Sequence, residues 1–200
     1  MKENKLLVLI SASNLLDYPT SEWKNELYDL QADFLETVES EALKQEFNQA
    51  INPILSMSDK ELRECYVNSF DLSNQTGLYL TAHELGDSSK RGAALIRLKN
   101  IVEGAGYSLD EKELGDFMPM LFELVAVAEE NEELQRLERR LSVAVQRIID
   151  HLDEDHPYLG IFHLLMNYAF SKPSTDEIIA LENNREKADL EELPYPIMYQ

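Results

Sequence analysis

Apolar side chains recur along most of the chain at the spacing of an α-helix. The clearest run has intervals of four, three, four and four residues and comprises Trp23, Leu27, Leu30, Phe34 and Val38. Comparable stripes cover residues 43–54, 95–102 and 134–148. Because a helical turn takes about 3.6 residues, these intervals place the apolar side chains on one face of a helix. The pattern therefore predicts amphipathic helices in all four stretches.

Two further stretches, 117–128 and 158–170, are apolar on nearly every side. Helices of this kind are expected at the centre of a bundle, where neighbouring helices cover them. The alternating pattern that marks a strand is absent at useful length, and the sequence contains no internal repeat. We therefore expect an all-α, single-domain bundle of about eight or nine helices.

Helix-start signals agree with this division. In a capping box, a serine hydroxyl and a glutamate three residues later satisfy free backbone N–H groups. The chain has three such pairs, Ser58 with Glu61, Ser108 with Glu111, and Ser174 with Glu177. Pro119 and Pro157 suit the first turns of the two most apolar helices. Asp116 is placed to cap the helix that begins near 117.

The C-terminal stretch differs in composition from the rest of the chain. A length of 200 residues fits one domain, and 7 Gly and 7 Pro leave room for few turns. Over 172–200, however, seven acids outnumber three bases. We expect one helical domain over 1–171, followed by an acidic segment over 172–200. In that segment we expect a helix from about 175 to 189 and then a flexible tail.

Charge and cysteine content exclude several classes of protein. With 18 Lys and Arg against 38 Asp and Glu, the net charge is −20. Nucleic-acid binding needs clustered cations, so the charge disfavours it and favours a basic partner. A lone cysteine, Cys65, permits no internal disulfide and suits a reducing compartment. The apolar run at 6–10 is shorter than the roughly 7–15 residues of a signal peptide, and no stretch approaches the ~18 of a membrane span. We expect a soluble, cytoplasmic protein without membrane insertion.

Catalytic motifs are incomplete in this sequence. His83 and Glu84 begin a zinc-protease motif, but that motif needs a second histidine at the position that Asp87 occupies. The stretch 86–92 lacks the Gly-Lys-Ser/Thr of a phosphate-binding loop, and no serine-hydrolase elbow is present. The motifs therefore indicate no active site.

Five residues near one another in the sequence could in principle bind a metal, namely Asp150, His151, Asp155, His156 and His163. Pro157 interrupts the helix between them, so we expect His163 in the core, the other two histidines in loops, and no metal site. Cys65 is expected to be a buried or half-buried apolar residue. A small metal- or thiol-dependent hydrolase that uses His151 with His156, or Cys65, is the alternative from another functional class.

Acidic residues gather around the apolar stretch 117–128, and they are Asp116, Glu123, Glu129, Glu130, Glu132 and Glu133. They form either a solvated acidic face or the rim of an apolar groove. A groove of that kind would accept an amphipathic or basic helical peptide.

Several stretches resemble one family of proteins. Residues 66–71 and 77–92 resemble the signature of the NarJ-type nitrate reductase delta subunits, which are molybdenum cofactor assembly chaperones. Residues 113–124 are similar to a helix start shared with the wider TorD-like redox-enzyme chaperones, and 14–19 fit the family's opening helix. The chain departs from the family pattern at Phe117, where many relatives carry His, and at Leu85, where this branch often has Arg.

This resemblance implies an all-helical TorD-like chaperone domain with neither catalysis nor a cofactor of its own. It implies binding to the apo catalytic (alpha) subunit of a respiratory nitrate reductase, mainly through the N-terminal peptide of that subunit. Such binding would enable molybdenum cofactor insertion and delay membrane attachment. A TorD-like chaperone for a dimethyl sulfoxide or trimethylamine oxide reductase is the alternative.

Ten residues are the candidate client-binding positions, namely Tyr66, Phe70, His83, Glu84, Asp87, Arg91, Asp116, Pro119, Phe122 and Glu123. Tyr66 and Phe70 lie four residues apart and are expected to pack against the helix 117–128, either as core or as groove lining. His83, Glu84, Asp87 and Arg91 share one turn region and are expected to form a charge network. Glu123 and the acids at 129–133 are expected to steer a basic peptide.

Overall fold

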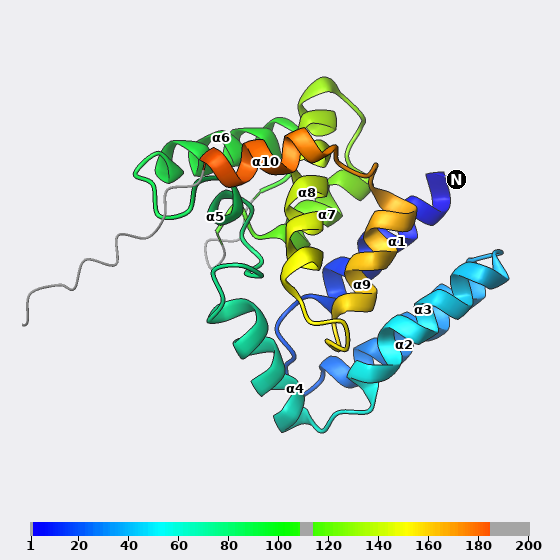
Figure 1. Ribbon diagram of the computed structural model, residues 1–200. Helices are drawn as coiled ribbons and strands as arrows, with labels where there is room; N and C mark the ends of the chain where they lie inside the picture. The colour runs from blue at the N-terminus through cyan, green and yellow to red at the C-terminus, as the bar shows by residue number, and fades with distance from the viewer. Residues whose placement is uncertain (1, 109–113, 185–200) are drawn as a thin grey trace, which may run out of the picture.

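Helices account for nearly all the regular structure of the chain. The computed structural model describes residues 2–108 and 114–184 (Figure 1). The α-helices in these residues are α1 (Lys2–Leu15), α2 (Trp23–Thr37), α3 (Glu41–Leu55), α4 (Asp59–Tyr66), α5 (Leu80–Leu85), α6 (Arg91–Gly104), α7 (Met118–Val127), α8 (Glu132–His151), α9 (Leu159–Leu164) and α10 (Thr175–Asn184). Two π-helices, η1 (Val67–Asp71) and η2 (Leu165–Ala169), directly continue α4 and α9. The described part contains no strand, which confirms the all-α prediction.

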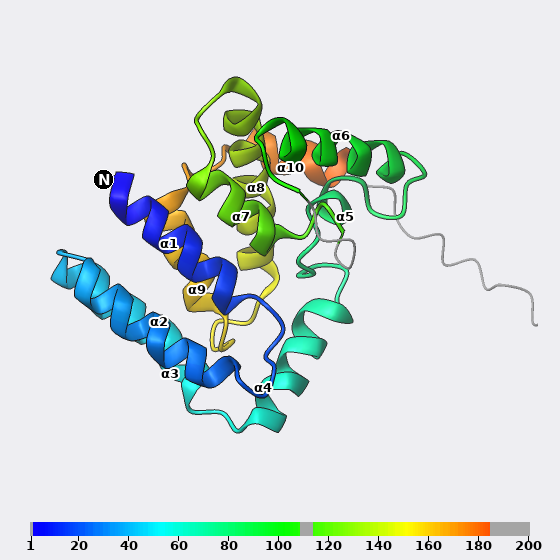
Figure 2. The same ribbon diagram turned by 180° about the vertical axis from the view of Figure 1, so that it is seen from behind.

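The apolar stripes of the sequence form the core, as predicted. Helix α7 lies beside α1 and is near the middle of the molecule in the two opposite views (Figures 1 and 2). Its residues Met118, Leu121 and Phe122 are completely buried, as expected for a helix that is apolar on nearly every side. Helices α2 and α3 form a hairpin in which the rings of Phe34 and Phe47 stack with centroids 3.8 Å apart.

A glycine allows this hairpin to pack closely against the rest of the fold. Helix α3 lies against α9, where Gly160 faces Ala50. A Cβ on Gly160 would lie 2.7 Å from the Cα of Ala50, so only glycine fits at this helix crossing. The contact fixes α9 against α3 at backbone distance.

Two of the three predicted capping boxes are present. The Ser58 hydroxyl caps α4 and the Glu61 carboxylate returns to the Ser58 backbone N–H at 2.8 Å. The Ser174 and Glu177 pair makes the same contacts before α10. Glu111, the partner expected for Ser108, lies outside the described residues.

The prediction that Asp116 caps α7 is wrong. The residue at the N-cap of α7 is Phe117, and it makes no side-chain capping bond. A short antiparallel bridge between Tyr79 and Phe117 instead aligns the two segments that precede α5 and α7. Its hydrogen bonds run from the Met118 N–H to the Leu78 carbonyl at 2.8 Å and from the Leu80 N–H to the Asp116 carbonyl at 2.9 Å. This pairing turns the Asp116 side chain toward α5.

The C-terminal helix α10 packs against α5 and α8. Its Leu181 is buried, and it covers one end of the molecule together with α6 (Figure 1). Residues 185–189 of the helix expected over 175–189 lie outside the described residues. Over the residues that the structure describes, no helix has the length and apolarity needed to cross a membrane.

Candidate functional site

A groove of about 810 Å³ lies between α5, α6, α8 and α10. Its walls carry an apolar set of residues, namely Leu85, Ala94, Ile101, Leu137, Val143, Ala180 and Leu181. Ala94, Arg97 and Ile101 are spaced by three and four residues, so a single face of α6 lines one side. Gly86 ends α5 with a φ of 59°, a backbone conformation that suits glycine and that redirects the chain toward α6.

Cations are concentrated in this groove although the protein is strongly acidic. Of the 18 Lys and Arg of the chain, five line the groove, namely Lys90, Arg97, Arg136, Arg139 and Arg140. The acids that line it are Glu84, Glu133 and Glu177. The lining therefore has a net charge of +2, opposite in sign to the protein as a whole.

Two of the five cations are held by acids of the lining. Arg140 on α8 donates hydrogen bonds to both carboxylate oxygens of Glu84 on α5, at 2.6 and 2.8 Å. Arg139 binds both oxygens of Glu177 on α10. These bidentate pairs fix the walls relative to one another.

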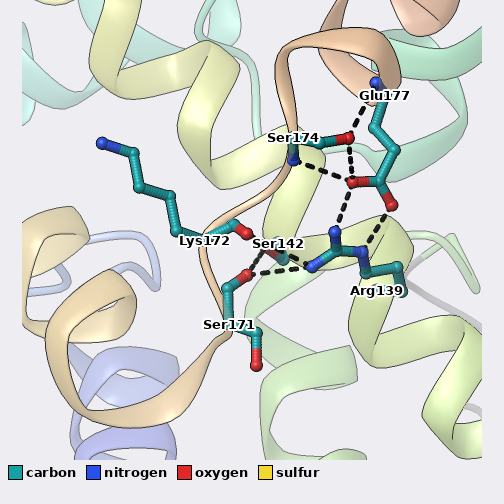
Figure 3. A network of polar contacts seen from close by, with 6 residues as sticks. All are labelled: Arg139, Ser142, Ser171, Lys172, Ser174 and Glu177. Atoms are coloured by element: carbon teal, nitrogen blue, oxygen red, sulfur yellow. Dashed lines mark hydrogen bonds and ion pairs between the residues drawn. The ribbon is translucent and has the colours of Figure 1, made fainter.

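The pair of Arg139 and Glu177 belongs to a larger network that anchors α10 (Figure 3). Arg139 also donates to the Ser171 and Lys172 carbonyls, at 3.3 and 3.4 Å, and the Ser142 hydroxyl donates to the Ser171 carbonyl at 2.6 Å. Hydrogen bonds from Arg139, and then from Ser174, lower the pKa of Glu177 to about 2. The carboxylate that anchors this wall of the groove therefore stays ionised down to strongly acidic pH.

The other cations keep their charge available to the groove. Within the described residues, neither Lys90 nor Arg97 has an ion-pair partner, and both side chains are exposed. Among residues 2–108 and 114–184, the ion-pair partner of Arg136 is the highly exposed Glu132, one turn earlier on α8, at 3.2 Å. An exposed pair at this spacing contributes little to stability, so Arg136 can exchange partners readily.

A buried arginine, about two turns further along α8 than Arg140, also contacts α5. Arg147 of α8 is 2% exposed and donates to the Gln75 carbonyl at 2.7 Å, to Glu182 of α10 at 2.5 Å and to Nδ1 of His83 at 3.2 Å. Because Nδ1 accepts this bond, His83 carries its proton on Nε2, which donates to the Gly77 carbonyl at 2.6 Å. His83 therefore acts as a neutral link between α8 and the segment before α5.

Asp116 joins the start of α5 to the start of α6. One of its oxygens, Oδ2, accepts hydrogen bonds from the Thr81 N–H at 3.2 Å and from the Thr81 hydroxyl. Arg91 approaches the same oxygen at 3.4 Å and donates through Nε to the Thr81 hydroxyl at 2.9 Å. Asp116 is completely buried, and its second oxygen has no hydrogen-bond partner among the described residues. The carboxylate thus satisfies the free N-terminus of α5 rather than that of its own following helix.

The predicted charge network among four motif residues is wrong. Arg91 binds Thr81 and Asp116, His83 binds Arg147, and Glu84 binds Arg140, while Asp87 is exposed. Three of the partners lie far away in the sequence, on α8 or before α7. The four residues are close in the sequence, but their side chains do not share a network: His83, Glu84 and Arg91 each bind a different neighbour.

Tyr66 and Phe70 belong to an aromatic cluster with Tyr158 and Phe162, and their expected packing against 117–128 stays a prediction. Their rings meet edge to face at 5.1 Å, and Phe70 contacts Tyr158 and Phe162 in the same way at 5.1 and 6.1 Å. The Tyr66 hydroxyl donates to the Leu16 carbonyl at 3.0 Å. Both side chains are only 3% exposed, so in this structure they are core residues.

On α7, Phe122 and Pro119 are buried, and Glu123 is exposed. The Phe122 ring lies 5.8 Å from that of Phe170. Contact between a client and the buried members of the predicted set would need the core to open, and the role of all ten residues in binding stays a prediction.

A serine and a histidine meet beside the lone cysteine, and their geometry opposes a hydrolase. Ser69 Oγ lies 2.8 Å from Nε2 of His156, while Nδ1 of His156 accepts a bond from the Tyr158 N–H at 3.2 Å. The neutral ring therefore carries its proton on Nε2 and donates to Ser69, whose own proton goes to the Cys65 carbonyl at 2.6 Å. A histidine that donates to the hydroxyl cannot act as its general base.

The other histidines also differ from expectation. His163 is exposed, not in the core, because even a mostly apolar helix keeps one side toward solvent. His151 closes α8, where its Nδ1 donates to the Arg147 carbonyl at 2.8 Å. Across residues 2–108 and 114–184, no three side chains of the metal-binding types gather into a site.

The groove cations were not among the predicted site residues. Arg136, Arg139 and Arg140 stand at spacings of three and four in the sequence, which is the spacing of one helix face. That spacing was a visible signal, but only the fold shows that this face meets α5, α6 and α10.

No family model matches the chain. It is 30% identical over 164 residues to the probable nitrate reductase molybdenum cofactor assembly chaperone NarJ of Bacillus subtilis (strain 168), a match over 82% of this chain and 88% of that protein. It is 25% identical over 178 residues to the nitrate reductase molybdenum cofactor assembly chaperone NarJ of Escherichia coli (strain K12), over 86% and 74% of the two chains. It is 31% identical over 134 residues to the probable nitrate reductase molybdenum cofactor assembly chaperone NarW of the same strain, over 66% and 56%.

Proposed function

The chain belongs to the nitrate reductase molybdenum cofactor assembly chaperones, a family of chaperones and not of enzymes, and we propose that it binds the cofactor-free catalytic subunit of a nitrate reductase. Binding runs mainly through the N-terminal segment of that subunit and takes place in the cytoplasm. It keeps the subunit open for insertion of the molybdenum cofactor and delays attachment to the membrane.

We place the bound segment in the groove between α5, α6, α8 and α10. The observation that carries this placement is the position of the motif 77–92, whose residues form α5 and the start of α6 and thus two walls of the groove. An apolar trough between helices suits a helical segment with one apolar face. Burial of apolar area at roughly 25 cal/mol per Å² supplies the affinity, less the cost of ordering the segment.

The ten predicted client-binding residues divide into two groups under this proposal. Glu84 lines the groove, and Asp87, Arg91 and Glu123 have exposed or half-buried side chains that a large client can reach. The buried group consists of Tyr66, Phe70, His83, Asp116, Pro119 and Phe122. We propose that these buried residues hold the helices in place and act on binding only indirectly.

The alternative client, a dimethyl sulfoxide or trimethylamine oxide reductase, has no support in the names of the relatives, which all refer to nitrate reductase. The hydrolase alternative likewise has no support in the names of the relatives, which are all assembly chaperones.

Co-elution in size-exclusion chromatography tests the proposal with three forms of a nitrate reductase catalytic subunit. The forms are the apo subunit, the apo subunit without its N-terminal segment, and the cofactor-loaded subunit. We expect a complex with the first, a much weaker one with the second and none with the third.

Absence of a complex with the apo subunit would refute the chaperone–client pairing. Equal binding of the first two forms would refute the role of the N-terminal segment, and equal binding of the loaded form would refute selection for the apo state.

A further inference from the structure

The groove holds cations that no acid of the described protein neutralises. Lys90 and Arg97 both stand on its α6 side, exposed and without an ion pair in the described residues. On the α8 side, the ion-pair partner that the described residues offer Arg136 is Glu132, an exposed neighbour on its own helix. A bound segment would therefore meet positive charge on two sides of an apolar floor.

The spacing of Lys90, the N-cap residue of α6, and Arg97 sets the distance between the two charges that a bound segment meets. Lys90 and Arg97 are seven residues apart, which is about two helical turns or ~10 Å along the axis. Ala94 lies between them on the groove side, and Ile101 continues the same face one turn further. The face thus alternates charge and apolar surface with the period of a helix.

We infer that the groove selects a helical client segment with two carboxylates about two turns apart along one apolar stripe. One carboxylate pairs with Lys90 and the other with Arg97, while the stripe between them covers Ala94 and the floor formed by Leu137 and Val143. This inference deepens the proposed function, on which it rests, by naming the chemistry of the segment that occupies the groove.

A basic segment fits these walls less well. Two of the three acids of the lining, Glu84 and Glu177, are already bound to arginines on both oxygens. Only Glu133 remains to receive a cation, at the end of the groove where α8 begins. A segment with basic residues opposite Lys90 and Arg97 would bring like charges together in a partly desolvated site.

The net charge of the chaperone determines whether the preference for an acidic segment appears in the association or in the dissociation rate constant. A chain of charge −20 repels an acidic segment at distances within the Debye length, about 10 Å at 0.1 M salt. Attraction by Lys90 and Arg97 begins only on contact. The preference for carboxylates therefore lies in slower dissociation and not in faster association.

Two synthetic helical peptides test the inference on the full chain. Both carry the same leucine and alanine stripe, and they differ only in having Glu or Lys at two positions seven residues apart. We expect the Glu peptide to bind wild-type protein about tenfold more tightly than the Lys peptide, mainly through slower dissociation.

Charge-reversed variants complete the test. Arg97→Glu should weaken the preference for the Glu peptide, and the double variant Lys90→Glu with Arg97→Glu should reverse it. Lys99→Glu is the matched control for Arg97→Glu, because Lys99 is exposed on the same helix, lies outside the groove lining and changes the net charge by the same amount. It should keep the wild-type preference.

Three results would overturn the inference: equal or tighter binding of the Lys peptide to wild-type protein, no binding of either peptide, or an equal effect of Lys99→Glu. The same variants titrated with the apo catalytic subunit separate the two claims. If the subunit binds while the peptide preference is absent, the charge selection fails and the proposed function stands. If the wild-type protein does not bind the subunit, the proposed function itself fails.

Discussion

Asp116 accepts hydrogen bonds from both the backbone N–H and the hydroxyl of Thr81, a residue 35 positions earlier in the chain. The contact joins two segments that each resemble a family motif, 77–92 and 113–124. It also holds α5, one wall of the groove, against the segment that leads into α7. Two stretches that are separate in the sequence therefore form one structural unit.

Replacement of Asp116 by Ala should lower the free energy of unfolding by about 3 kcal/mol. The substitution leaves the Thr81 donors without their acceptor in a fully buried site, and it leaves Arg91 without its carboxylate. Urea unfolding measures the change. Asp87→Ala, which removes an exposed acid from the turn after α5, is the control and should stay within about 0.5 kcal/mol of wild type. Equal stability of the two variants would show that the Asp116 contact does not hold the fold.

Replacement of Gly160 by Ala should lower the free energy of unfolding by about 1–3 kcal/mol. The added methyl group would lie 2.7 Å from the Cα of Ala50 and 2.9 Å from its Cβ, so α9 and α3 must move apart. Gly92→Ala is the matched control, because a methyl group there meets nothing within 4 Å and favours the helix. Thermal unfolding measures the stability of both variants. A Gly160→Ala protein as stable as Gly92→Ala would contradict the close packing of α9 against α3.

Acid should destabilise the protein partly through His156. Burial lowers the pKa of this imidazole below its ordinary 6.5, against the opposing effect of Asp153 and Asp155. The unfolded chain therefore takes up the proton first, and the contribution of His156 to stability falls as the pH decreases below about 6.5. In His156→Gln, this part of the pH dependence should disappear.

Titration of the His156 ring by NMR measures its pKa directly. The neutral ring accepts from the Tyr158 N–H, an interaction that a doubly protonated ring cannot make. A pKa at or above 6.5 in the folded protein would contradict both the burial effect and the assigned proton position.

Removal of α10 should cost stability. The domain expected from the sequence ends at residue 171, so its fold would not depend on the segment 172–200. The contacts point the other way. Burial of Leu181 is worth about 2 kcal/mol, and the truncation also removes Glu177 and Glu182, the partners of Arg139 and Arg147.

Two truncated proteins isolate the contribution of α10, one ending after Ser171 and one after Asn184. The first should unfold at lower urea concentration than the second. If both unfold at the same concentration, the contacts of α10 in Figure 3 contribute nothing measurable.

The parts of the fold that depend on residues close together in the sequence could be predicted from it. The stripe of Trp23, Leu27 and Phe34 is a local pattern, and so are the capping boxes at Ser58 and Ser174, so each could be predicted without a structure. The π-helices that continue α4 and α9 carried no such pattern, and the stretch 158–170 was predicted as a single helix.

The groove is held together by ion pairs between residues that are distant in the sequence, and these pairs could not be predicted from the sequence. Arg140 and Glu84 are 56 positions apart, and Arg139 and Glu177 are 38 apart. Asp116 was expected to cap the helix next to it, because capping is usually local. Its actual partner is decided by the bridge between Tyr79 and Phe117, which forms only when the chain has folded.

The most direct test of the proposed function is a calorimetric titration of the apo catalytic subunit into wild-type protein, Ala94→Trp and Ala93→Trp. Ala94 lines the groove, whereas Ala93 is its exposed neighbour on α6 outside the lining, so the two variants place the same indole inside and outside the groove. We predict that Ala93→Trp binds like wild type and that Ala94→Trp binds at least about tenfold more weakly, a loss of about 1.4 kcal/mol. Wild-type affinity in Ala94→Trp, with wild-type protein binding the subunit, would contradict the placement of the client in the groove.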